Sequence, residues 1–178
     1  MGSEQSKDKM HCTRYLNGNG PPSLTEQVEK ATNGTIGHKI NSKIVIGNQP
    51  DDGKMSIMHA RRNVEGYPDC DTIQMNFEFD DGIQTEMHPN PGQKYYGLKT
   101  VAFVPQNHEG RKVYRMLEAA FKHKLLFTVA TTSTGEERVN YSDIPLKTKE
   151  SGGHDSFSYP DPKYLKTVTK ILKLKGIQ

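Results

Sequence analysis

Four blocks rich in proline and glycine constrain the fold of this chain more than any other feature. They read IGNQPDDGKMS from Ile46, GIQTEMHPNPGQKYYG from Gly82, NHEGRKVYRMLEAAF from Asn107 and SYPDPKYL from Ser158. Proline fixes the backbone angle φ and glycine permits positive φ, so such blocks encode defined turns rather than generic loops. Four of them in a fixed order predict a specific scaffold of turns between regular elements.

The N-terminal part of the chain differs from the rest in composition. The chain has 178 residues, which suits one domain with a tail. Residues 1–42 contain few large apolar side chains and cannot bury enough surface to offset the entropy of ordering. They are expected to form a flexible arm, with residues 43–178 as the folded domain. Residues 24–31 could form a short amphipathic helix in the arm.

The cysteines exclude several kinds of site. Cys12 and Cys70 are far apart and form no CxxC pair, which argues against a disulfide framework and favours a reducing compartment. A RING finger holds two zinc ions with about eight closely spaced Cys and His ligands. This sequence cannot supply such a set, and we expect no metal site.

The sequence also bears on membranes. It contains no apolar run of the roughly 18 residues that a transmembrane helix needs, and its polar start is no secretory signal, so a cytoplasmic location is expected. The first residues, MGSEQSK, fit the pattern for N-myristoylation at Gly2. One myristoyl chain binds membranes only weakly, so stable membrane association would need a second signal. The alternative is that Met-Gly-Ser is an ordinary start.

Hydrophobic patterning predicts an α+β domain, a single mixed domain of mostly antiparallel strands with two main helices. Strands are expected at 72–79, 98–104 and 138–141, and the most apolar run, 125–131, is expected to be a central strand. A hairpin is expected from 44–46 and 55–59 around the turn at 50–53. The prolines of 88–92 require a rigid loop there.

The two expected helices have clear boundary signals. Asn107 can cap a helix that begins near Glu109 and carries apolar residues at helical spacing. Asp161 and Pro162 should begin the last helix and Gly176 should end it. Lysines cover the other sides of this helix. A solvated surface is the expected explanation, and a strip facing phosphate or ubiquitin is the alternative.

In their order and residue types, the four blocks resemble the Deltex C-terminal domain over about residues 44–178. In Deltex-type proteins this domain follows a RING finger and completes an E3 ubiquitin ligase, and in several members it binds ADP-ribose or NAD. The resemblance therefore implies the Deltex fold, a place in the ubiquitin pathway and, by family, Notch-type signalling. It implies no resident cofactor, and ADP-ribose or NAD would be the ligand.

Two functional positions of active Deltex domains are replaced here. The segment 143–148 holds two histidines in active members, whereas this chain has Pro145 and Leu146. An imidazole can hydrogen-bond a ribose or carry a proton near neutral pH, and proline can do neither. A glutamate of the last helix would act as a base on the ribose hydroxyl that receives ubiquitin, and Ile171 stands at its position. No catalytic residue is therefore predicted.

Other positions keep residues that could contact a ligand in a pocket. By resemblance, Ser133 matches a ligand-contacting serine, and Phe157 stands where some members have a histidine and others an aromatic residue. Tyr159 could stack on a ring, and His154 could replace a missing histidine. Each has a local alternative, such as a turn role for Ser133 or packing beside Pro160 for Tyr159.

Together these features favour a binding or scaffold module in ubiquitin or ADP-ribose signalling without autonomous ligase activity. The expected partners are a RING-type or other ubiquitin-pathway protein and an ADP-ribosylated protein. The alternative is the substrate-presenting part of an E3 ubiquitin-protein ligase whose RING comes from a partner. A nucleic-acid binder is a third class, which the net charge of +3 does not favour.

Overall fold

The computed structural model describes residues 46–153 and 155–178. Several expectations lie outside the described residues: the arm at 1–42 with its helix at 24–31, the lipidation of Gly2, and the role of His154. None of the described helices is long and apolar enough to cross a membrane.

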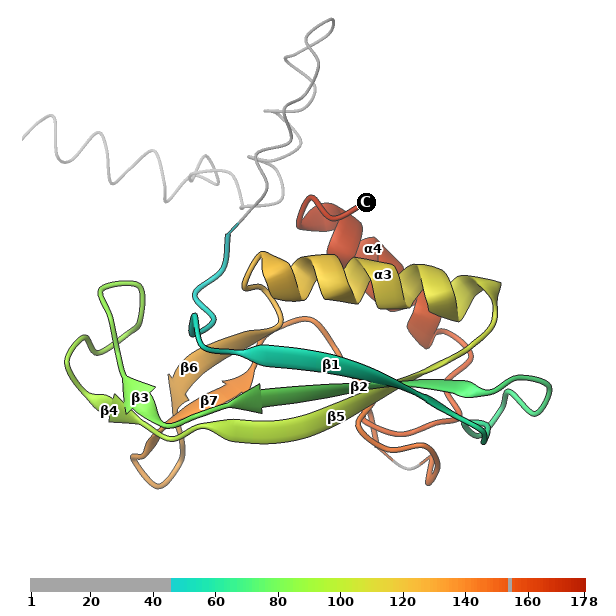
Figure 1. Cartoon of the computed structure of the whole chain (residues 1–178), viewed down its shortest axis with the longest axis horizontal. Helices are drawn as coiled ribbons and strands as arrows, with labels where there is room; N and C mark the ends of the chain where they lie inside the picture. The colour runs from blue at the N-terminus through green and yellow to red at the C-terminus, as the bar shows by residue number, and fades with distance from the viewer. Residues whose placement is uncertain (1–45, 154) are drawn as a thin grey trace, which may run out of the picture. The chain divides into compact units, whose positions relative to one another are not determined.

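The described part has the expected α+β architecture, with strands that pair antiparallel and two helices (Figure 1). This confirms the predicted fold class. The elements in chain order are β1 (Lys54–Ala60), β2 (Thr72–Phe79), β3 (Gly82–Ile83), β4 (Lys94–Tyr95), β5 (Leu98–Pro105), α3 (His108–Lys122), β6 (Phe127–Thr131), β7 (Glu137–Tyr141) and α4 (Tyr164–Leu174).

The main sheet has the strand order β1-β2-β5, so β2 is its central strand. The alternation predicted for 72–79 is confirmed. Four residues of β2 face the core and are at most 2% exposed: Ile73, Met75, Phe77 and Phe79. Because strand side chains alternate between faces, Gln74, Asn76 and Glu78 of β2 lie on the opposite, partly open face of the sheet.

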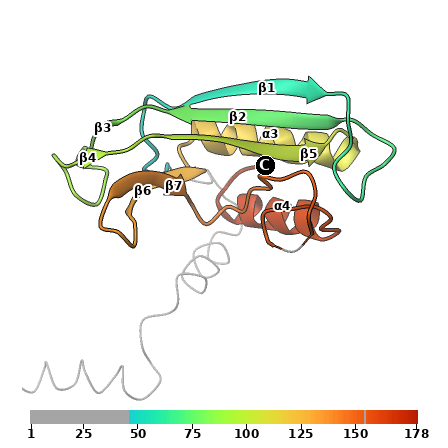
Figure 2. The same cartoon turned by 90° about the horizontal axis from the view of Figure 1, so that it is seen from below.

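Helix α3 covers the apolar face of this sheet (Figure 2). The predicted cap is confirmed, since Asn107 Oδ1 accepts a hydrogen bond of 2.8 Å from the Gly110 amide. At the other end of α3, the Phe121 ring lies 5.6 Å from the Phe77 ring and 6.2 Å from the Phe79 ring. Helix and sheet therefore share one aromatic core.

Helix α4 begins at Tyr164, two residues later than predicted from Pro162. The Asp161 carboxylate still accepts a hydrogen bond of 3.1 Å from the Lys163 amide. Its other oxygen, however, binds the ammonium of Lys147, so the residues after Asp161 form a turn before the helix. The predicted end is confirmed: Gly176 adopts a φ of 85°, and the next amide donates to the Leu172 carbonyl oxygen in a Schellman motif.

The predicted hairpin around 50–53 is wrong. β1 pairs with β2 along its whole length, and Ile46, the only described residue of the expected first strand, lies in no strand. The residues after it instead bond to the end of α3, through the Gly47 amide to the His123 carbonyl oxygen at 2.9 Å. A side chain at Gly47 would collide with the Lys124 carbonyl oxygen, so glycine permits this close approach.

The prediction of a central strand at 125–131 is also wrong in part. The strand is β6, which begins at Phe127, and within the described residues it pairs only with β7. The run is apolar because it is buried, not because strands flank it on both sides. The Phe127 ring lies 5.1 Å from that of Phe77 and 5.0 Å from that of Phe79. Periodicity alone does not distinguish these two causes of a continuous apolar run.

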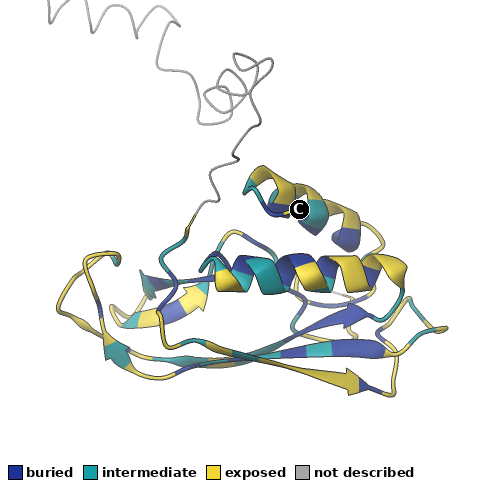
Figure 3. Cartoon of the chain, turned by 45° about the horizontal axis from the view of Figure 1, so that its top comes forward, coloured by how far each residue is buried: buried dark blue, intermediate teal, exposed yellow. Residues whose placement is uncertain are grey.

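The two edges of the main sheet differ. The β5 edge is covered where the Phe103 amide donates to the Lys147 carbonyl oxygen at 2.8 Å. The outer edge of β1 has no strand partner among the described elements. β1 is mostly exposed, as Figure 3 shows, with Ile57 and Met58 44% and 49% exposed.

Candidate functional site

The residues singled out by family resemblance lie mainly on the segment 143–164, which runs from the end of β7 to the first residue of α4. This segment runs beside β5 and is fastened there by the hydrogen bond from the Phe103 amide to the Lys147 carbonyl oxygen. Further along, Lys149 and Ser158 form a parallel bridge within the segment. The segment is therefore a folded-back loop whose two halves lie against each other.

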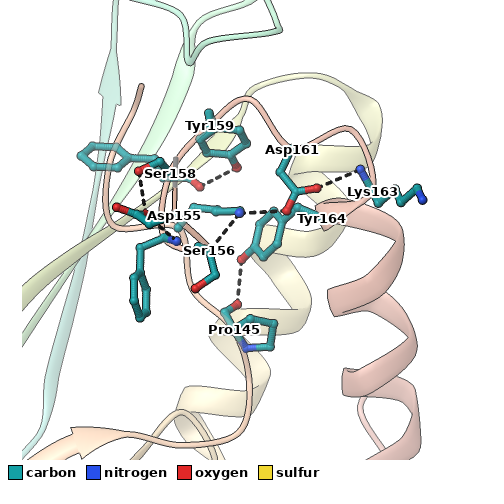
Figure 4. Close-up of polar contacts among 11 residues, drawn as sticks. Pro145, Asp155, Ser156, Ser158, Tyr159, Asp161, Lys163 and Tyr164 are labelled. Atoms are coloured by element: carbon teal, nitrogen blue, oxygen red, sulfur yellow. Dashed lines mark hydrogen bonds and ion pairs between the residues drawn. The ribbon is translucent and has the colours of Figure 1, made fainter. Parts of the chain in front are cut away.

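A buried lysine organises this loop, whose polar contacts around Asp161 and Tyr164 are drawn in Figure 4. The side chain of Lys147 is 2% exposed. Its ammonium donates to the Asp161 carboxylate at 2.9 Å and to the Ser156 carbonyl oxygen at 2.8 Å, and it lies 5.1 Å from the centre of the Tyr164 ring. A buried charge is tolerated when it is paired and hydrogen-bonded in this way. Lys147 thus ties the loop to the start of α4.

Pro145 and Leu146, which the family resemblance places where active members are expected to have histidines, are part of this packed structure. Leu146 is 3% exposed and belongs to the hydrophobic core. The Pro145 carbonyl oxygen accepts a hydrogen bond of 2.9 Å from the Tyr164 hydroxyl. Neither side chain can donate or accept a proton. Ile171 on α4 is half-buried against the same core.

Tyr159 is buried completely. Its hydroxyl donates to the Phe103 carbonyl oxygen at 2.9 Å, and its ring meets those of Tyr67 and Tyr164 edge-on, with centroids 6.1 Å apart in each case. In this arrangement protein surrounds the ring on all sides. The predicted stacking of Tyr159 on a ligand would require the loop to open, and it stays a prediction.

Phe157 is the exposed aromatic residue of the loop, with 46% of its surface accessible. Its ring lies 6.4 Å from that of Tyr141, whose hydroxyl is 2.6 Å from the Thr100 hydroxyl. Thr100 and Thr148 both line an open hollow of about 690 Å³ beside the sheet. A ligand held in this hollow could therefore approach the Phe157 side of the loop.

Ser133 lies apart from these residues. It is exposed in the turn between β6 and β7, as the sequence predicts, and Gly135 adopts a φ of 85° there. Tyr141, which packs against Phe157, is at the far end of β7. Four steps along a strand at roughly 3.3 Å each span about 13 Å. Only an extended ligand could contact both Ser133 and Phe157.

The pKa shifts in the loop keep its ionisable groups in one charge state and do not favour proton transfer near neutral pH. Hydrogen bonds, first from the Lys149 ammonium and then from neighbouring groups, lower the pKa of Asp155 to about 2. The buried ammonium lowers the pKa of Asp161, and burial raises those of Tyr159 and Tyr164. Each shift moves the pKa away from neutrality, whereas a general acid or base works best with a pKa near the ambient pH.

Sequence reasoning missed Lys147. Lysine is almost never fully buried, and its partner Asp161 is 14 residues away, so no local pattern marks the pair. The one indirect signal is that Lys147 directly follows the apolar segment from Ile144 to Leu146. No cluster of His, Cys, Asp and Glu that could hold a metal ion occurs in the part of the chain that the structure describes.

The sequence of the chain matches a known protein family and several known proteins. The model of the Deltex C-terminal domain family matches residues 46–177. The chain is 40% identical over 136 residues to the human protein named "Probable E3 ubiquitin-protein ligase DTX3", over 75% of this chain and 39% of that protein. It is 36% identical over 167 residues to "E3 ubiquitin-protein ligase DTX1" of Xenopus laevis, over 92% of this chain and 25% of that protein. The chain thus spans less than half the length of these relatives.

Proposed function

The chain belongs to the Deltex C-terminal domain family, and from this membership we propose that it is a binding or scaffold module in ubiquitin or ADP-ribose signalling. The names of the relatives it matches are those of ubiquitin-protein ligases, which supports an association with the ubiquitin pathway. Its partners would be a RING-type or other ubiquitin-pathway protein and an ADP-ribosylated protein. On this proposal the chain has no ligase activity of its own.

The observation that carries this proposal is the closed state of the loop 143–164. Leu146 is packed in the core and Pro145 offers only a backbone oxygen that Tyr164 already binds. The ionisable groups around them, Lys147 and Asp161, bind each other. The loop therefore supplies a rigid surface, which suits binding, and lacks a free proton-transfer group at these two positions, which ligase chemistry on a ribose would need.

Reconstitution tests the absence of autonomous activity. The full chain is incubated with ubiquitin-activating enzyme, a ubiquitin-conjugating enzyme, ubiquitin and ATP, and conjugates are detected on gels. We expect none above the background without the chain. A DTX1 fragment containing the RING and the C-terminal domain serves as positive control. Robust conjugate formation by the chain alone would overturn the proposal.

A second function is favoured by the names of the relatives, which are those of ubiquitin-protein ligases. In this function the chain is the substrate-presenting part of an E3 ubiquitin-protein ligase and acts with a RING supplied by a partner. Adding a separate RING protein to the reconstitution distinguishes the two functions. Stimulated modification of ADP-ribose or NAD would support the ligase, and unchanged background would support the scaffold.

ADP-ribose is the proposed ligand of the module. The exposed Phe157 and Ser133 support binding, since an aromatic face and a hydroxyl suit a base and a ribose. Calorimetry and thermal shift measure it directly, because a ligand that binds the native state raises its stability. Phe157→Ala should weaken binding, and Leu174→Ala, which alters a residue 78% exposed on α4, should not. No thermal shift at millimolar ADP-ribose would leave protein partners as the only ligands.

A further inference from the structure

The first two blocks of proline and glycine meet at a cavity far along the chain from the loop 143–164. It has a volume of about 330 Å³ and lies between the segments 46–52 and 82–95, beside the Lys124 side chain. We call it the block cavity. Sites for drug-sized ligands have volumes of about 300–1,000 Å³. The block cavity is at the lower end of this range, so its size suits one large side chain better than a whole nucleotide.

Backbone contacts hold the walls of the block cavity in place. The segment 46–52 is fastened to the end of α3 through the amides of Gly47 and Gln49. On the other wall, a side chain at Gly82 would collide with the Tyr95 hydroxyl and ring, so glycine leaves room for the Tyr95 side chain to pack over β3. The His88 ring packs edge-on against Tyr95, and its Nδ1 accepts from the Thr85 amide. The cavity is thus a built feature of the two blocks.

Gln49 places an unsatisfied acceptor at this cavity. The residue is 4% exposed and lines the cavity. Its amide nitrogen donates to the Phe121 carbonyl oxygen at 3.3 Å, whereas its Oε1 is buried without a hydrogen-bond partner in the described part of the chain. A buried acceptor without a donor is costly, and most buried polar atoms in native proteins are paired. Oε1 has almost no accessible surface, so a donor that arrives with a ligand can pair with it only when the Gln49 side chain turns toward the cavity.

The charge around the cavity indicates what kind of donor would bind. Asp51 and Asp52 are exposed at its rim, and Lys124 pairs with Asp51 alone. The pKa of the Tyr95 hydroxyl is raised, first by burial and then by the nearby Asp52 carboxylate, with smaller effects from Asp51 and Asp80. Among the described residues, Asp52 is therefore the carboxylate of the rim that forms no ion pair with a lysine or arginine, and its charge can attract a cation.

The rim of the cavity is apolar. Ile46, Ile83 and Met87 are 66%, 60% and 64% exposed, and all three line the cavity. Single exposed apolar residues are ordinary, but three around one opening mark a surface for contact with another protein. An aliphatic side chain of the partner would cover this rim.

We propose that the block cavity binds a segment of a partner protein in which an arginine lies beside an aliphatic residue. The guanidinium group has five donors in a fixed plane, so it can pair with the Asp52 carboxylate and, once the Gln49 side chain turns toward the cavity, donate to Gln49 Oε1. The neighbouring aliphatic residue packs on Ile46, Ile83 and Met87. This binding site is separate from the loop 143–164 and does not rest on the function proposed above.

Nuclear magnetic resonance of the isotope-labelled full chain tests the proposal with a minimal probe, N-acetyl-leucyl-argininamide. The matched control is N-acetyl-leucyl-citrullinamide, which has nearly the same shape without the charge. We expect saturable shifts of the amides in 46–52 and 82–95 with the arginine probe. Binding of the citrulline probe should be about tenfold weaker, as for loss of a charged hydrogen bond. No saturable shifts, shifts elsewhere in the chain, or equal affinities for both probes would overturn the proposal.

Two variants locate the interaction. Asp52→Asn removes an exposed charge and should weaken the arginine probe about threefold to fivefold, because exposed ion pairs are modest. Asp69→Asn removes another exposed carboxylate, away from the cavity, and should leave the affinity unchanged. Equal effects of the two variants would show that the probe senses only overall charge, which would also overturn the proposal.

Discussion

The loop 143–164 and the block cavity are both built from turns rich in proline and glycine, yet they differ in how completely their polar groups are paired. In the loop, the buried Lys147 has a carboxylate, a carbonyl oxygen and an aromatic ring as partners. At the cavity, Gln49 keeps a buried acceptor without a partner among the described residues. Polar groups that are all paired stabilise one conformation, whereas an unpaired acceptor beside a cavity can bind a donor group of a ligand. The difference assigns a structural role to the first region and a binding role to the second.

The variant with the largest expected effect on stability removes the partner of the buried lysine. Asp161→Ala leaves the ammonium of Lys147 without its carboxylate. Breaking a buried ion pair costs several kcal/mol. The Asp161 side chain is 38% exposed, so in the variant water can solvate part of the ammonium group of Lys147. We therefore expect a loss of about 2–3 kcal/mol in the free energy of unfolding. Urea denaturation measures the free energy of unfolding. A loss below about 0.5 kcal/mol would mean that the network does not stabilise the loop.

Two controls accompany Asp161→Ala. Asp80→Asn removes a carboxylate that is 62% exposed and pairs with Lys54 at 3.8 Å, so it should change the unfolding free energy by less than about 0.5 kcal/mol. The double variant Lys147→Met with Asp161→Ala removes both charges and should regain much of the lost stability, because an apolar replacement of a buried pair is often neutral.

The next test disturbs a wall of the block cavity. Gly47→Ala places a methyl group against the Lys124 carbonyl oxygen, so the segment must move. We expect a loss of about 1–3 kcal/mol, as for overpacked sites, together with loss of binding of the arginine probe. Gly135→Ala is the control: its φ of 85° also strains a side chain, but the space around it is open. It should lower stability and leave probe binding intact.

Tyr159→Phe tests the pairing of the loop at a single hydrogen bond. The variant leaves the buried Phe103 carbonyl oxygen without its donor, and we expect a loss of about 1–2 kcal/mol in urea denaturation. Tyr96→Phe, at a tyrosine that is 41% exposed, should change stability much less. Equal changes in the two variants would contradict the structural role assigned to Tyr159.

Acid titration tests the same loop through its carboxylates. The pKa of Asp155 is lowered to about 2, so its contribution to stability is complete above its ordinary pKa near 4 and is lost as the pH falls through 2. The lowered pKa of Asp161 acts in the same direction. The urea midpoint should therefore decline between about pH 4 and pH 2. Asp155→Asn should decline less steeply, and an identical decline would show that the Lys149 pair contributes nothing.

The smallest expected effect is at Gln49. Gln49→Leu removes the unpaired acceptor and one long hydrogen bond of 3.3 Å, and these changes offset each other. We expect the unfolding free energy to stay within about 1 kcal/mol of the original. Binding of the arginine probe should nevertheless be lost. A large loss of stability would show that Oε1 is paired in solution, and would remove the contrast with the loop.

Local patterns predicted the elements whose signals are local. The alternation of β2 and the cap and apolar stripe of α3 depend on neighbours within a few residues, and both are confirmed. The hairpin at 50–53 failed because the partner of β1 is β2, beyond an intervening loop. Turn residues show where a chain bends, but not which strand it then pairs with.

The polar sites were less predictable than the fold. The pairing of Lys147 with Asp161 and the empty acceptor of Gln49 both depend on residues brought together only by the complete fold. The family resemblance located the loop 143–164 but drew attention to positions 145 and 171, not to the buried ammonium between them. The roles of Ser133, Phe157 and His154 in ligand binding stay predictions.

The free edge of β1 has a consequence for handling this protein. The seven residues of β1 follow a regular register without proline or a bulge, no strand of the described part pairs with their outer edge, and Ile57 and Met58 are exposed there. Such an edge pairs readily with another strand, so at high concentration the chain should associate edge to edge before it unfolds. Met58→Lys would place a charge on this edge, on the face away from the core because Met58 pairs with Gln74, and the solubility limit should rise while the melting temperature hardly changes.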